Sequence, residues 1–102
     1  MNEELANLSC EIIAAVGSAK GQYIEAIQLA KIGKIEEAEQ CVEKGEQDFL
    51  KGHDIHRELL SKMANGEDIK VDLLLVHAEC QMMSAEDFSV IANEVIDFMK
   101  NK

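Results

Sequence analysis

Apolar and polar residues alternate along most of the chain with the spacing of an α-helix. Spacings of three and four between apolar positions are typical of a helix that buries one face. In the first third of the chain the positions with this spacing are Leu5, Leu8, Ile12, Ala15, Ala19, Tyr23, Ala26 and Ala30. The pattern predicts an amphipathic helix over residues 3–32, which ends where Gly33 follows a turn that contains Lys31.

Two glycines lie within this first helix, four residues apart on one face, at Gly17 and Gly21. A glycine inside a helix costs about 1 kcal/mol relative to alanine, so a structural reason for the pair is expected. We expect close packing, in which the missing side chains let a neighbouring backbone approach. A hinge at this point is the alternative.

A second apolar pattern predicts a helix over residues 34–64. Its members follow a heptad-like repeat. They are Ile35, Ala38, Val42, Gly45, Phe49, Gly52, His56, Leu59 and Met63. Because only a residue or two separates this helix from the first, the two are expected to run antiparallel. Asn65-Gly66 then predicts a turn, and Glu67 to Lys70 a polar connector.

The third helix is expected over residues 70–100, with Asp68 or Asp72 as its N-cap. It carries two apolar stripes. The first consists of Leu74, His77, Gln81, Ser84, Phe88, Ile91, Val95 and Phe98, and the second of Leu73, Val76, Cys80 and Met83. A helix that is apolar over so much of its circumference needs more than two neighbours of its own chain to cover it. The sequence therefore predicts an all-α, antiparallel, up-down-up bundle of three helices, a single domain over residues 1–102, that self-associates through its last helix.

Composition agrees with this prediction and excludes several functions. The chain has 102 residues, no proline and only 4% aromatic residues, so strand formers are scarce. The formal charge of −10 disfavours a nucleic-acid partner. It suits a basic protein partner, although a merely solvated acidic surface is the simpler interpretation. No apolar run reaches the roughly 20 residues of a membrane span, so no membrane insertion is expected. Cys10, Cys41 and Cys80 form no CxxC pair, which is typical of reduced thiols, and we expect a cytoplasmic protein.

The three histidines are the candidates for chemistry. His53 and His56 have a spacing that can chelate a metal ion. No cysteine or third histidine lies near them in the sequence, so packing is the favoured interpretation. His77 lies among large apolar residues, where packing is again the commoner role.

No familiar catalytic motif competes for the site. The chain has no nucleophile elbow, no glycine-rich phosphate loop and no HExxH motif. What a shallow helical surface can support is nucleophilic attack by an exposed imidazole on a phosphoryl donor. His77 is the residue expected to carry such chemistry.

The third helix and several landmarks elsewhere point to one family. Leu74-Leu75-Val76-His77-Ala78, followed by Met82-Met83, resembles the active-site helix of the lactose/cellobiose-type enzyme IIA of the bacterial sugar phosphotransferase system. Further similar landmarks occur in the same order, at Gly17-Ser18-Ala19, Ala30-Lys31-Ile32-Gly33, Ala38 and Gly52-His53.

The resemblance implies an enzyme component with a phosphohistidine intermediate, assembled as a homotrimer. His77 would accept a phosphoryl group from the phosphocarrier protein HPr and pass it to enzyme IIB. The sugar taken up would be a β-linked disaccharide such as lactose, cellobiose or chitobiose. The resemblance also implies that Leu74 and Gln81 lie near the active site.

The chain departs from the family pattern directly after His77. Where the family usually has Gln-Asp-His after His-Ala, this chain has Glu79-Cys80-Gln81, and His56 stands where a glutamine is common. Cys80 thus replaces the aspartate that gathers a metal ion at the trimer axis. Three thiols at an axis can pack as small hydrophobes or, as thiolates, bind a soft metal such as zinc. Packing is favoured because converging thiolates repel each other, and we expect no metal and no other cofactor.

These departures leave a second function open. The chain can be a non-catalytic trimeric helical module, with an interaction or regulatory role, that keeps the bundle but has lost efficient transfer.

Overall fold

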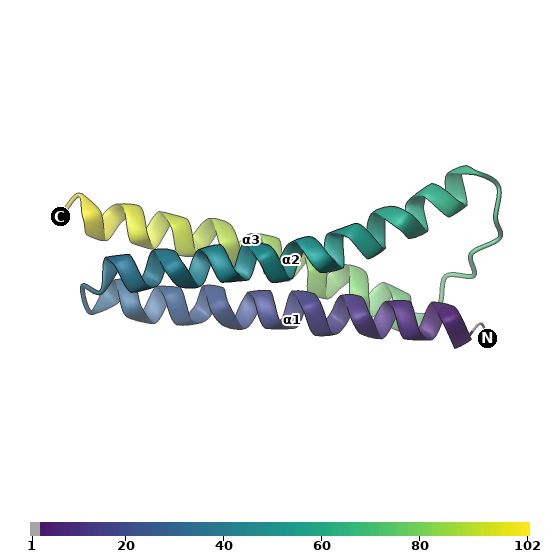
Figure 1. Ribbon diagram of the computed structural model, residues 1–102, viewed down its shortest axis with the longest axis horizontal. Coiled ribbons are helices and arrows are strands. Elements are labelled where there is room, and N and C mark those ends of the chain that lie inside the picture. Colours follow the sequence, from purple (N-terminus) through teal and green to yellow (C-terminus); the bar gives the residue numbers. More distant parts are fainter. Residues whose placement is uncertain (1–2) are drawn as a thin grey trace.

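The computed structural model describes residues 3–102, and these form three long α-helices (Figure 1). Helix α1 spans Glu3–Lys31, α2 spans Ile35–Ala64 and α3 spans Leu73–Lys100. The helices run up, down and up, so the two ends of the chain lie at opposite ends of a bundle 52 Å long (Figure 1). The described residues contain no strand, and the all-α prediction with three helices is confirmed. Residues 1 and 2 of the expected domain lie outside the described part.

The turn between α1 and α2 is a glycine-terminated helix end. Gly33 has a φ of +82°, a region that side chains disfavour. Its N–H donates to the Ala30 carbonyl at 3.0 Å, and the Lys34 N–H donates to the Leu29 carbonyl at 2.9 Å. This pair of bonds is the Schellman motif. Gly66, with a φ of +88°, ends α2 with the same pair of bonds.

Helix α3 begins at an aspartate cap, three residues later than the expected residue 70. The Asp72 carboxylate accepts a hydrogen bond of 2.9 Å from the Leu75 N–H. The backbone of Asp72 is extended, so helical geometry starts only after it. Of the two caps that the sequence offered, Asp72 is the one used.

The face of α1 predicted from spacing is the centre of the core. Ile12, Val16 and Tyr23 are almost fully buried there. Opposite them, α2 buries the stripe that its heptad pattern indicated, with Ala38, Val42, Gly45, Gly52 and Leu59. The spacing of apolar residues therefore identified the inward faces of both helices.

The close approach between α1 and α2 occurs at glycines of α2 rather than of α1. A Cβ on Gly52 would lie 2.8 Å from Val16 Cγ1, and one on Gly45 would meet the ring of Tyr23. Gly17 and Gly21 are exposed, with nothing within 4 Å of a Cβ placed there. The expectation that these two glycines admit a neighbouring backbone is therefore wrong within the chain. Gly17 follows the core residue Val16 and is turned about 100° away from it around the helix.

Helix α3 packs inward with a face that neither of its two predicted stripes contains. The residues buried on this face are Leu75, Ala78, Met82, Ala85, Ala92 and Ile96. Phe88 and Val95 of the first stripe are half-buried against the core, but several large side chains of the two stripes are exposed: Leu73, Val76, Met83, Ile91 and Phe98. Much apolar surface of α3 therefore stays uncovered within one chain.

Helices α2 and α3 contact each other less than either contacts α1. The C-terminal half of α2 also bends away from the other two helices before the chain crosses back to α3 (Figure 1). No described helix is both long and apolar enough to cross a lipid bilayer.

Candidate functional site

His77 lies on the exposed surface near the N-terminal end of α3. Together with Leu73 and Leu74 it lines a shallow hollow of about 500 Å³. None of the described residues forms a hydrogen bond or ion pair with the His77 ring. Because no described side chain occupies them, the ring nitrogens of His77 are available to an incoming phosphoryl donor.

Of the two residues expected near His77, Leu74 lines the hollow with it and Gln81 does not. Gln81 lies one turn further along the helix and is half-buried. The hollow is built from the first turns of a single helix. The described residues of one chain therefore form no enclosed pocket at His77. This open surface suits an imidazole that a partner protein reaches, rather than a pocket that binds a small substrate.

Cys80 lies on the outward side of α3, away from α1 and α2. The neighbouring residues of its stripe, Leu73, Val76 and Met83, are also exposed. Within residues 3–102, no group of three or more metal-binding side chains comes together. A thiol at this position does not fit the hard divalent ion that a carboxylate would hold, because such ions prefer oxygen ligands.

His53 and His56, the second candidate pair from the sequence, serve different contacts. The His53 ring lies 6.3 Å from the Phe49 ring, centroid to centroid, and its buried Nδ1 has no hydrogen-bond partner among the described residues. His56 Nε2 lies 2.6 Å from Oε1 of Glu79 on α3. His56 therefore contacts a carboxylate of another helix and does not share a metal site with His53.

The contact between His56 and Glu79 could not be predicted from the sequence. Each of the two residues departs from the family pattern, but nothing in the sequence links one departure to the other. They lie on different helices, and the spacing of apolar residues does not report which polar side chains face each other across two helices.

A larger hollow, of about 590 Å³, lies between α2 and α3. Tyr23, Phe49, Leu50 and Val90 give it a mainly apolar lining. Burial raises the pKa of the Tyr23 phenol, a hydrogen bond with Ser89 opposes this, and nearby carboxylates add to the increase. The spacing of apolar residues could not predict this hollow, because its lining comes from all three helices.

Comparison with known proteins identifies the family to which this geometry belongs. The family described as "PTS system, Lactose/Cellobiose specific IIA subunit" matches residues 7–100. The chain belongs to this family. The resemblance noted in the sequence is therefore confirmed, and the protein is a phosphotransferase component of the sugar phosphotransferase system.

Individual members of the enzyme IIA family agree over nearly the whole chain. The oligo-beta-mannoside-specific EIIA component of Bacillus subtilis (strain 168) is 35% identical over 95 residues, covering 93% of this chain and 86% of that protein. The galactose-specific EIIA component of Lactococcus lactis subsp. cremoris (strain MG1363) is 40% identical over 85 residues, covering 83% and 73%.

Solved structures of enzyme IIA proteins share the fold. The cellobiose-specific enzyme IIA from Bacillus anthracis superposes with a TM-score of 0.92 at 31% identity, covering 99% of this chain and 92% of that one. PtcA from S. mutans gives a TM-score of 0.95 at 29% identity, with 98% of each chain covered.

Proposed function

We propose that this protein is the phosphocarrier subunit that takes a phosphoryl group from HPr onto His77 and passes it to enzyme IIB. The observation that carries the proposal is the exposed His77 imidazole, which has no partner among the described residues and lies at a shallow, open hollow. In each transfer a ring nitrogen bonds to phosphorus as the bond to the donor breaks, and the reverse exchange delivers the group to the acceptor. A site of this kind has to be reached by two different protein partners in turn.

The proposed assembly is a homotrimer in the cytoplasm, formed through α3 with Cys80 at the axis. Support comes from the outward stripe of α3, where Leu73, Val76 and Met83 are 83%, 43% and 57% exposed. Leaving a contiguous apolar surface in water is unfavourable, so another chain is the expected cover. The net charge of −10 suits the docking of a basic partner.

The proposed sugar is a β-linked disaccharide of the lactose, cellobiose or chitobiose class. Relatives of this chain are named for oligo-beta-mannoside, cellobiose, lichenan and lactose, and one is named for galactose. Apart from galactose, these names denote β-linked sugars that differ in their units, so the proposal extends to the class and not to one member.

A non-catalytic trimeric module is the second candidate. The observation that favours it is the altered sequence after His77, in which Glu79 is engaged by His56 and Cys80 lacks a carboxylate. Such a module would keep the bundle and its apolar α3 surface but would not turn over phosphate.

One experiment separates the two candidates. The protein is incubated with phosphoenolpyruvate, enzyme I and HPr, and its mass is measured before and after acid treatment. We expect an acid-labile gain of one phosphate in the wild type and in His53→Gln, and none in His77→Ala. No gain in the wild type, or a gain that persists in His77→Ala, would exclude His77 as the carrier.

A further inference from the structure

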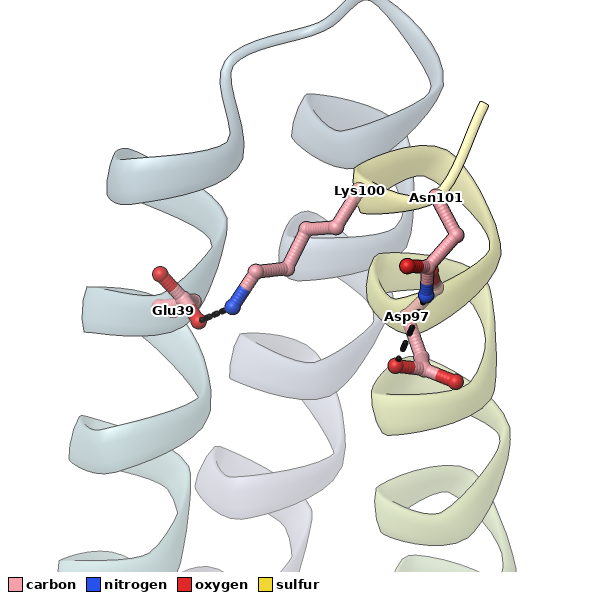
Figure 2. A network of polar contacts seen from close by, with 4 residues as sticks. All are labelled: Glu39, Asp97, Lys100 and Asn101. Carbon is pink, nitrogen blue, oxygen red and sulfur yellow. Dashed lines mark hydrogen bonds and ion pairs between the residues drawn. The ribbon is translucent and has the colours of Figure 1, made fainter.

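Two side-chain ion pairs join α2 to α3 in the described part of the chain, one beyond each end of the hollow between these helices. At one end Lys100 Nζ lies 3.1 Å from Glu39 Oε2 (Figure 2). At the other end His56 Nε2 lies 2.6 Å from Glu79 Oε1. Helices α2 and α3 share few other contacts, since each packs mainly against α1.

The two pairs differ in how strongly water screens them. Lys100 and Glu39 are 51% and 50% exposed, and a pair so exposed contributes little to stability. His56 and Glu79 are 19% and 39% exposed, so their attraction is screened less. The histidine pair is therefore the stronger contact between the two helices.

We propose that His56 and Glu79 act as a positioning pair, which holds the first turns of α3 in place against α2. Glu79 follows His77 by two residues on the same helix, so a movement of Glu79 also displaces His77. A protonated imidazole gives a charge-assisted bond to the carboxylate, whereas a neutral ring donates only an ordinary hydrogen bond. The consequence for phosphoryl transfer rests on the proposed role of His77; the tie itself does not.

The groups around His56 leave Glu79 as its partner. On α2, the neighbouring His53 ring packs near the Phe49 ring. Arg57 forms an ion pair with Asp54, one turn earlier on the same helix. Helix α1 meets this part of α2 with apolar side chains such as Val16. On α3, Glu79 is the carboxylate in contact with His56.

The test is a double-mutant cycle with neutral side chains of similar size. His56→Gln, Glu79→Gln and the double variant are unfolded in denaturant under the same conditions. We expect each single change to raise the unfolding equilibrium constant about fivefold, because it removes the contact and leaves one partly buried polar group without its partner. The double variant is expected to match a single one rather than the product of both.

Glu39→Gln serves as the matched control, since it breaks the exposed pair and is expected to change the unfolding constant less than about twofold. A positioning role also predicts faster hydrogen exchange at the amides of residues 73–80 in the single variants. The rate of phosphate uptake from HPr should fall in each single variant and should fall no further in the double variant.

Additive effects of the two substitutions, or single variants with unchanged exchange over residues 73–80, would overturn the proposal. The wild type in the same uptake assay keeps the two proposals apart. If the wild type takes up no phosphate, the carrier role of His77 fails, while the unfolding cycle and the amide exchange still decide whether His56 and Glu79 act as one unit.

Discussion

Gly45 of α2 lies directly against the Tyr23 ring of α1, so that a Cβ on Gly45 would be 2.6 Å from Tyr23 Cε1. Tyr23 is only 1% exposed and packs within a cluster of buried residues from all three helices. The two helices can approach this closely only because position 45 has no side chain.

Gly45→Ala should therefore destabilise the protein. Forcing an extra methyl group into a packed core lowers the free energy of unfolding by about 1–3 kcal/mol. Gly17→Ala is the matched control, because nothing lies within 4 Å of a Cβ there. An exposed helical glycine replaced by alanine should raise the free energy of unfolding by about 0.5–1 kcal/mol. Chemical denaturation of both variants measures the difference, and equal effects would contradict the packing described.

Removal of the α3 cap should cost stability near His77. Asp72→Ala deletes the acceptor of the Leu75 N–H bond, and the loss of such a cap lowers the free energy of unfolding by about 1 kcal/mol. Asp68→Ala changes an exposed aspartate of the same connector and should have little effect. Thermal unfolding of the two variants compares them. If Asp68→Ala proves the more harmful, α3 starts earlier in solution than at Leu73.

Tyr23 should make the protein sensitive to alkaline pH. Its pKa is raised in the folded chain, so above the ordinary value near pH 10 the unfolded chain loses its phenol proton first. Stability is then retained below about pH 10 and lost as the pH rises through the higher folded pKa. Because the sequence contains one tyrosine, phenolate absorbance reports this group alone. Tyr23→Phe should reduce the alkaline loss of stability, and titration of the wild type at the ordinary pKa would refute the prediction.

The outward stripe of α3 should control the oligomeric state. Val76→Lys and Met83→Lys place charges on a surface that we expect to be covered in the trimer, so each should release monomers at micromolar concentration. Ile32→Lys is the control, since Ile32 is 68% exposed in the turn between α1 and α2. Sedimentation velocity measures the species present. A wild type that sediments as a monomer at the same concentration would argue against assembly through α3.

Cys80→Asp should restore a dependence on divalent ions. Three carboxylates brought together at an axis repel each other unless a cation lies between them, whereas thiols can pack without one. We expect the variant to remain trimeric and to gain thermal stability when magnesium is added, with no such gain in the wild type. Indifference of the variant to magnesium would speak against an axial position for residue 80.

The elements and two of the inward faces could be predicted from the sequence. The apolar spacing of α1 and α2 led to their buried stripes, and Gly33 and Gly66 marked helix ends because their backbone conformation is one that other residues avoid. His77 could be singled out as the candidate for chemistry, and Leu74 does lie beside it. Local conformational preference determines features of this kind, and it is encoded within a few neighbouring residues.

The inward face of α3 could not be predicted, because apolar residues surround most of that helix. Ala78 and Ala85 are small enough to let α3 approach α1, and they are fully buried, while the larger Leu73 and Phe98 remain outside. The fit between facing surfaces made that choice, and spacing along one helix carries no information about the shape of its neighbour.

By itself, the sequence determined three helices, their order and turns, and a histidine among apolar residues. Only the tertiary structure decided that Gly45 rather than Gly17 admits a neighbour, that Leu73, Val76 and Met83 of α3 stay exposed, and that His56 meets Glu79. Helices and turns follow from interactions between residues close in the chain. Contacts between helices depend on the rotation and offset of whole elements, which are fixed only when all three pack together.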